Sequence, residues 1–227
     1  MEYEIKGANL PVVICRLNSG EKMVSQAGAM GWMSENIKMD TNMKGGLMGG
    51  IGRVFSGESL FLNTFASSGG PGLIAFPSSF PGRILALELK SGESVIAQKD
   101  AFLAAEESVT LEVYFKKKIS SGLFGGEGFI LQKITGPGIV FLEFDGHIEE
   151  YDLAPRETMR VDTGHVAMFE SSVEFDVVSV KGMKNVLFGG EGLFLTTLTG
   201  PGKVYLQTMP IQNLAGQIYK IFPGKPD

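Results

Sequence analysis

Apolar and polar residues alternate in short runs along most of this chain, which is the spacing of β-strands that bury one face. The clearest run occurs three times, at Ile37–Asp40, Val109–Glu112 and Val173–Asp176. In each copy the first and third residues are apolar and the fourth is acidic. We therefore expect the apolar positions to face the core and the acids to face water. With Gly and Pro at the breaks between runs, this pattern predicts an all-β fold.

Two further blocks recur with the alternating runs. Each copy has a glycine-rich block that leads into an apolar strand, followed by a Gly-Pro-Gly turn. The blocks are Phe55–Leu62, Phe124–Leu131 and Phe188–Leu195, and the turns are Gly70–Gly72, Gly136–Gly138 and Gly200–Gly202. The aligned apolar positions predicted to form the core are Ile37, Val109 and Val173; Met39, Leu111 and Phe175; Leu60, Phe129 and Leu193; and Leu62, Leu131 and Leu195. A fixed internal period indicates a repeated architecture.

The repeats predict one pseudo-symmetric body over residues 1–215. It divides into repeat 1 (1–78), repeat 2 (79–154) and repeat 3 (155–215), and a C-terminal tail covers 216–227. Short, evenly spaced strands suit barrels, sandwiches and β-helical folds alike. The internal repeat favours three tandem β-units packed around a pseudo-three-fold axis.

A turn block extends the alignment. Leu17–Glu21 matches Leu89–Glu93 and, more loosely, Val161–His165, so that the last residue of this turn is Glu in two copies and His165 in the third. The one helix predicted spans Ile211–Phe222, where apolar residues recur at a spacing of four.

The repeated motifs resemble a known family. The doubled Leu-Phe-Gly-Gly-Glu-Gly at 123–128 and 187–192, with Thr-Gly-Pro-Gly at 135–138 and 199–202, is similar to the "altered inheritance of mitochondria" family, also called domain of unknown function 124. The resemblance covers nearly the whole chain. It implies that each repeat is similar to a subunit of the tryptophan RNA-binding attenuation protein, a short double-stranded β-helix.

The same resemblance bears on function. Eukaryotic members of that family are mitochondrial and tied to inner-membrane organisation, whereas prokaryotic members are cytoplasmic proteins of unknown function. The chain resembles the prokaryotic type. The family carries no established catalytic residues, so none is transferred to this chain and no cofactor is expected.

Charge and cysteine content narrow the class of protein. The net charge is −5, and the one basic run, Lys116–Lys118, is interpreted as a solvated turn. Nucleic acid is therefore an unlikely partner, because binding it normally needs a concentrated positive surface. Cys15 is the single cysteine, which excludes a disulfide within one chain. The start of the chain lacks the basic and apolar regions of a signal peptide, so we expect a cytoplasmic protein.

Glu58, Glu127 and Glu191 occupy the same place in the three glycine-rich blocks. Under three-fold symmetry they would form a trio of carboxylates, and such a trio could bind a hard cation such as calcium or magnesium. The alternative is that each Glu caps its own turn by accepting backbone N–H bonds, and the flanking glycines favour this alternative.

Repeat 1 carries about three extra residues within Lys44–Gly52 compared with the other copies. Met43, Leu47, Met48 and Ile51 make this glycine-rich segment apolar, so we predict a contact loop for a partner or a bilayer, or a loop folded onto the core or a subunit interface. Its glycines do not end in Gly-Lys-Ser/Thr, which argues against a phosphate loop.

The leading hypothesis is a non-enzymatic, homo-oligomeric β-scaffold that binds a protein partner or a membrane surface, with a trimer favoured. Trp32, aligned with Ala104 and Met168, is interpreted as a core or interface residue. The alternative is a small-molecule-binding protein or enzyme with its site in a cleft between repeats. Such a cleft would gather polar residues from non-repeated positions, for example His165 with Asp162 and Glu170.

Overall fold

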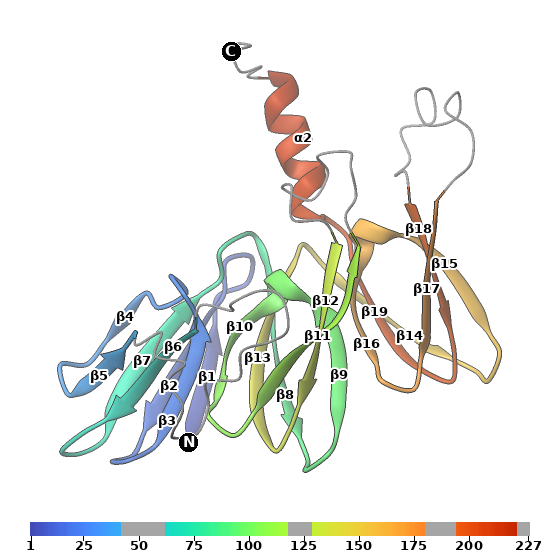
Figure 1. Ribbon diagram of the computed structural model, residues 1–227. Coiled ribbons are helices and arrows are strands. Elements are labelled where there is room, and N and C mark those ends of the chain that lie inside the picture. Colours follow the sequence, from blue (N-terminus) through green and yellow to red (C-terminus); the bar gives the residue numbers. More distant parts are fainter. Residues whose placement is uncertain (42–61, 118–128, 180–193, 222–227) are drawn as a thin grey trace.

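The computed structural model describes residues 1–41, 62–117, 129–179 and 194–221, which form antiparallel β-sheets and one α-helix (Figure 1). The predicted all-β fold is confirmed. The helix, α2 (Ile211–Ile221), lies where the sequence predicts it. Two short 3-10 turns, η1 (Lys99–Ala101) and η2 (Thr163–His165), each precede a strand.

The described strands form four sheets, which we call A to D. Sheet A has the order β1 (Glu2–Lys6), β2 (Val12–Leu17), β7 (Gly72–Pro77) and β4 (Trp32–Met33). Sheet B has the order β5 (Ile37–Asp40), β6 (Leu62–Ser67), β3 (Lys22–Gln26), β10 (Phe102–Glu106), β13 (Gly138–Asp145) and β8 (Gly82–Leu89).

The remaining two sheets are also antiparallel. Sheet C has the order β11 (Thr110–Lys117), β12 (Phe129–Thr135), β9 (Ser94–Gln98), β16 (Val166–Glu170), β19 (Gly202–Gln207) and β14 (Ile148–Leu153). Sheet D has the order β15 (Thr158–Asp162), β18 (Phe194–Thr199) and β17 (Glu174–Ser179).

Equivalent strand pairs occur three times along the chain. One set is β2·β7, β8·β13 and β14·β19, and a second is β3·β6, β9·β12 and β15·β18. The local hydrogen bonding therefore repeats with the sequence blocks. The pseudo-three-fold axis and the double-stranded β-helix unit stay predictions.

The core lies in three layers between successive sheets. The A–B cluster includes Val13, Cys15, Phe65, Phe76 and Phe141; the B–C cluster includes Val24, Ala97, Ile134, Leu142 and Met168; the C–D cluster includes Phe129, Leu131, Val161, Phe169 and Leu198. The sheets consequently stack in the order A, B, C, D. In Figure 1 this stack runs from β4 on the left to β15, β17 and β18 on the right.

Most of the predicted core positions that the structure describes match these layers, whereas Leu60 and Leu193 lie outside the described residues. Ile37, Val109 and Val173 are all buried, and the acids that close the three alternating runs are all exposed, as predicted. The prediction that Met39 belongs to the core is wrong, since its side chain is 45% exposed. It lies on β5, an edge strand of sheet B, so it has a neighbouring strand on one side only.

Candidate functional site

A pocket of about 340 Å³ opens where several strands end beside the start of α2. Its polar lining comes from β3, β9, η1, β13 and β19, strands and a turn that are far apart in the chain. These polar residues are Gln26, Gln98, Asp100, Glu143, Asp145 and Gln207, and Ser79 joins them from the loop between β7 and β8. The volume lies at the lower end of the range for small-molecule sites.

The glutamines on one side of the pocket are held by hydrogen bonds. The Gln98 amide donates to the carbonyls of Val166 and Gly164. The Gln207 amide donates to the Gly164 carbonyl at 2.9 Å and to Gln98 Oε1 at 3.3 Å. Because both side chains are tied to the backbone beside η2, this wall of the pocket is ordered in advance of any ligand.

Glu143, which lines the pocket from β13, is also held by hydrogen bonds. Its carboxylate accepts hydrogen bonds from the Ser79 backbone N–H at 2.7 Å and from the hydroxyls of Ser78 and Ser79 at 3.0 and 3.1 Å. Neutral donors satisfy its oxygens, but no positive charge among these partners balances it.

Asp145 ties the pocket to the helix. Its Oδ2 accepts the backbone N–H of Ile211, the first residue of α2, at 3.0 Å. A carboxylate is stabilised at a helix N-terminus by the unpaired N–H groups and the helix dipole. Burial nevertheless raises the pKa of Asp145 to about 6; the Ile211 hydrogen bond opposes this rise, and the charges of Glu143 and Asp100 add to it.

The lining therefore favours a positive ligand. Three carboxylates converge there, and no Lys, Arg or His is found among the described residues that line the pocket. An ammonium or guanidinium group could face the carboxylates while its alkyl part packs against Phe80 and Ile211. Within the described ranges, no group of three or more His, Cys, Asp or Glu side chains is arranged to hold a metal ion.

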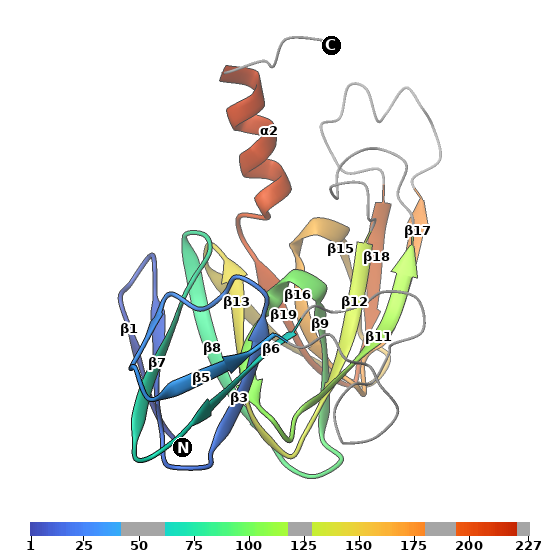
Figure 2. The ribbon, with the colours of Figure 1, turned by 60° about the vertical axis from the view of Figure 1, so that its left-hand side comes forward.

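A second candidate surface is the helix above the pocket. Figure 1 shows α2 standing away from the sheets, and Figure 2 shows the same from another direction. Ile211 and Leu214, nearer the sheets, are half-buried, whereas Ile218 is 52% and Ile221 is 70% exposed. Across the part of the chain described, no helix is long and apolar enough to span a membrane.

Two sets of predicted site residues fall outside the described residues. One is the contact loop with Met43, Leu47, Met48 and Ile51. The other is the carboxylate trio Glu58, Glu127 and Glu191. The metal and partner-loop hypotheses that rest on them stay predictions.

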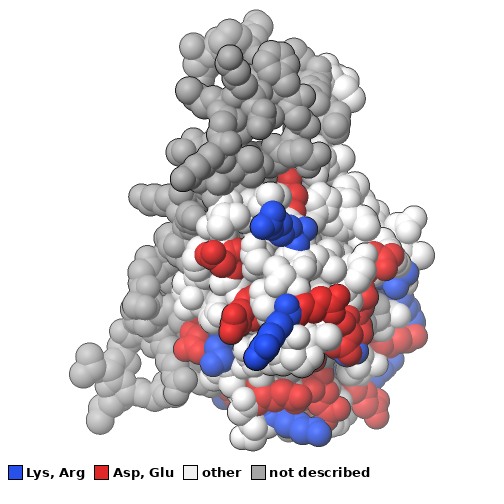
Figure 3. Space-filling model, turned by 90° about the vertical axis from the view of Figure 1, so that its right-hand side faces the viewer, with Lys and Arg blue, Asp and Glu red and all other residues white. Residues whose placement is uncertain are grey.

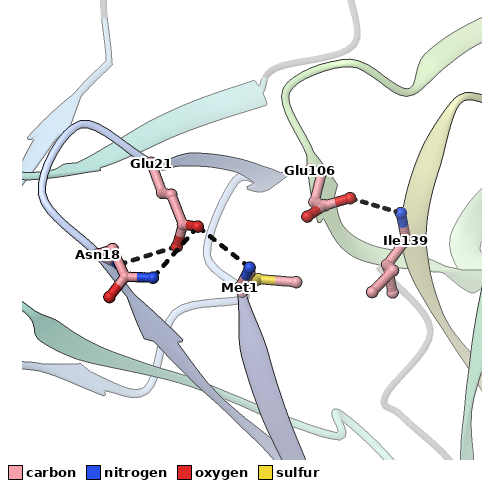
Figure 4. Close-up of polar contacts among 5 residues, drawn as sticks. All are labelled: Met1, Asn18, Glu21, Glu106 and Ile139. Carbon is pink, nitrogen blue, oxygen red and sulfur yellow. Dashed lines mark hydrogen bonds and ion pairs between the residues drawn. The ribbon is translucent and has the colours of Figure 1, made fainter.

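The repeated Ser-Gly turn needs a correction in the third copy. In each copy a glutamate accepts the backbone N–H three residues before it at 2.8 Å, and these residues are Glu21, Glu93 and Glu157. Figure 4 shows the first of them. The prediction that His165 takes the place of this glutamate in the third copy is therefore wrong. The alignment failed because Arg156, with φ of 69°, replaces the glycine of the other two turns.

A second repeated contact gives Glu170 a structural role. Its Oε2 accepts the backbone N–H of Lys203 at 3.1 Å, as Glu106 accepts that of Ile139 at 2.9 Å (Figure 4). The equivalent residue in the first copy, Ser34, accepts the N–H of the strand residue opposite it in the same way. These side chains join neighbouring strands, so Glu170 has a structural contact outside the pocket.

The other residues predicted for a cleft also lie outside the pocket lining. His165 Nδ1 lies 2.7 Å from the backbone oxygen of Gln207. Asp162 Oδ1 accepts the N–H of Gly164 at 3.1 Å, which caps η2. His165 therefore lies beside one wall of the pocket and supports it.

The residues that do line the pocket were not identified from the sequence. Asp145 stands in an Asp-Gly pair that predicts a hairpin turn, and its contact with Ile211 spans 66 residues. Gln98 and Gln207 are 109 residues apart. The only local signal was that a lone Asp and two Gln end apolar strands, which is not specific.

Comparison with known proteins places these features in a family context. The family model described as "Mitochondrial biogenesis AIM24" matches residues 3–209. An uncharacterised protein of Streptococcus pyogenes serotype M6, M6_Spy0233, is 32% identical over 227 residues, covering 96% of this chain and 89% of that protein. The crystal structure of the S. pyogenes protein SPYM3_0169 has a TM-score of 0.79 and 27% identity, covering 97% of this chain and 99% of that one.

Proposed function

Because this chain belongs to the AIM24 family and its relatives above are uncharacterised, we propose a function from its own surfaces: a non-enzymatic, homo-oligomeric β-scaffold that binds a partner protein. The observation that carries the proposal is the exposed apolar side of α2. A membrane surface is the competing target for the same helix.

The spacing on α2 favours a protein groove. Leu214, Ile218 and Ile221 stand at positions i, i+4 and i+7, which are the anchors that helix-in-groove recognition uses. The Asp145 carboxylate holds the first turn against β13, so the exposed end of the helix is presented from a fixed base. The helix is 11 residues long, or about 16 Å, enough for one short groove.

The test is capture from host lysate by wild type and by an Ile218→Ser/Ile221→Ser variant. We expect a partner bound by wild type to be lost or weakened roughly tenfold or more, because two buried anchors would be removed. The matched control is Leu10→Ser/Met39→Ser, which removes two exposed apolar side chains elsewhere. Equal capture by all three proteins would contradict the proposal. Flotation with phosphatidylcholine–phosphatidylglycerol vesicles, lost in the helix variant alone, would assign α2 to a membrane instead.

The scaffold is proposed to contain three β-units around a pseudo-three-fold axis, as the repeats predict. The pairing of β14 with β19 favours a third unit that begins before Ile148 and not at residue 155. We place the protein in the cytoplasm, and its single cysteine suits a reducing compartment. Burial raises the pKa of the Cys15 thiol to about 12, so this thiol is a poor nucleophile.

The pocket favours a second candidate function, the binding of a small organic cation. Putrescine and arginine are suitable probes, with glutamate as the anionic control. At a ligand concentration tenfold above Kd we expect Tm to rise by roughly 3 °C, and Asp145→Asn to reduce the rise. A thermal shift that is equal for cations and glutamate, or unchanged by the substitution, would count against this candidate.

A further inference from the structure

Sheets B and C are each built from two half-sheets joined by one strand pair. In sheet B, β3 pairs with β10, placing Ala104 opposite Ser25 and Ala105 opposite Val24. In sheet C, β9 pairs with β16, placing Met168 opposite Ala97 and Phe169 opposite Ile96. The two joints have the same register at equivalent positions of the repeat.

Among the described strands, sheets A and D each contain only one of the two half-sheets. Sheet D ends at β15, the counterpart of β3 and β9, and sheet A ends at β4, the counterpart of β10 and β16. Within the described part of the chain, β15 pairs only with β18, and β4 only with β7. Figure 1 places β4 and β15 at opposite ends of the sheet stack. Each end strand therefore has an outer edge that no described strand covers, and such an edge can pair with a strand of another chain.

Side chains on these two end strands are more exposed than their counterparts in the internal joints. Ala104 and Met168 are 0% and 1% exposed in the internal joints, but their counterpart Trp32 is 49% exposed. On the other side of the joint, Val24 and Ile96 are buried, whereas their counterpart Arg160 is exposed. An exposed Trp on a strand edge is a typical centre of a protein–protein contact.

We propose that β15 of one copy pairs antiparallel with β4 of a second copy, in the register of the two internal joints. Trp32 then lies opposite Val161, Met33 opposite Arg160, and Ser34 opposite Met159. Val161 belongs to the C–D cluster and is 7% exposed, so Trp32 of the second copy would pack beside the edge of that cluster. The contact joins two unlike edges, so it is head-to-tail, and both edges stay available in a dimer.

The charge on the sheet D end is compatible with a second copy. Figure 3 looks onto this end, where Lys and Arg lie among Asp and Glu. Arg160 lies in the middle of β15, and Glu174 and Asp176 lie on β17 of the same sheet. The sheet D end is thus not purely acidic, although the net charge of the chain is −5.

This inference rests on the oligomeric part of the proposed function, and light scattering separates the two. Wild type at about 100 μM should have a mass that is a multiple of 24.4 kDa, and Trp32→Lys should weaken association roughly 30-fold or more. Tyr151→Lys, on the edge strand β14, is the control and should assemble like wild type. A monomeric wild type overturns both the oligomer and the joint. Assembly that survives Trp32→Lys overturns the joint alone.

Disulfide trapping tests the register without relying on Trp32. Directly opposite residues in a β-pair lie about 4.5–5.5 Å apart at Cβ, close enough to cross-link, whereas diagonal pairs lie about 7–8 Å apart. A mixture of Met33→Cys and Arg160→Cys copies should therefore link, and a mixture of Met33→Cys and Thr158→Cys copies should link several-fold less. Cys15 is buried and stays out of the reaction. Linking by one variant alone would indicate a two-fold contact and contradict the head-to-tail joint.

Discussion

At the scale of single residues, Asp145 combines two roles that oppose each other. It accepts the first N–H of α2, which favours the charged form. It also lies half-buried beside Glu143 and Asp100, which disfavours the charged form, and the net result is a pKa of about 6. The carboxyl that anchors the helix is therefore also a carboxyl whose pKa is raised by its place in the pocket.

We predict that Asp145→Asn changes how stability depends on pH. The folded pKa of about 6 lies above the ordinary value of 3.8, so the folded protein binds more protons than the unfolded chain between these pH values. The stabilisation from this group is fully present below about pH 4 and is lost as pH rises through 6. Asn should accept the same N–H without this loss, gaining on the order of 1 kcal/mol above pH 7 after allowance for solvent screening.

Urea unfolding of wild type and Asp145→Asn at pH values from about 4 to 8 measures this effect. Asp176→Asn, which removes an exposed carboxylate on sheet D, serves as the control. A constant difference in free energy between wild type and Asp145→Asn across this range would contradict the prediction.

At the scale of elements, backbone hydrogen bonds join the repeated turns to one another. The N–H of Gly200 donates to the Glu157 carbonyl at 2.9 Å, and the N–H of Gly136 donates to the Glu93 carbonyl at 3.0 Å. In the second and third copies the Gly-Pro-Gly turn is thus packed against the glutamate turn of the same copy. A Cβ on Gly136 or Gly200 would lie 2.5 Å from backbone oxygens, which gives these two glycines a physical reason. In the first copy the N–H of Ser67 donates to the Glu21 carbonyl instead, and a Cβ on Gly70 would meet no atom within 4 Å.

We predict that Gly200→Ala destabilises the protein by roughly 2–4 kcal/mol. A Cβ at this position would lie 2.5 Å from the carbonyl oxygens of Leu153 and Ala154, and backbone atoms cannot move aside cheaply. Gly164→Ala is the matched control, because the nearest atom to its Cβ would be 3.5 Å away on Pro210. Chemical denaturation measures the free energy of unfolding of both variants. Similar losses of this free energy would mean that the close approach at Gly200 is not the cause of the destabilisation.

At the scale of the whole molecule, the sequence predicted what depends on local pattern. The all-β class, the helix at Ile211, the buried residues Ile37, Val109 and Val173 and the outward acids all follow from periodicities read over a few residues. The third glutamate turn was missed because Arg156 adopts a conformation that the pattern assigns to Gly.

Non-local features could not be predicted in this way. The joint between β3 and β10 brings together residues about 80 positions apart, such as Ser25 and Ala104, and no local signal indicates which strands meet. The pocket has the same origin, because Gln98, Asp145 and Gln207 come together only after sheets B and C stack. Trp32 aligned correctly with Ala104 and Met168, yet its exposure follows from its place at the end of the stack.

The two unlike free edges give any chain of copies a direction. A Trp32→Lys copy keeps an intact β15, so it could still receive the β4 edge of a normal copy, while its own β4 edge would accept no neighbour. Such a copy would act as a terminator: a small fraction of it, expressed beside wild type, would shorten every assembly that incorporates it. A single altered residue on one edge would thus behave as a dominant trait.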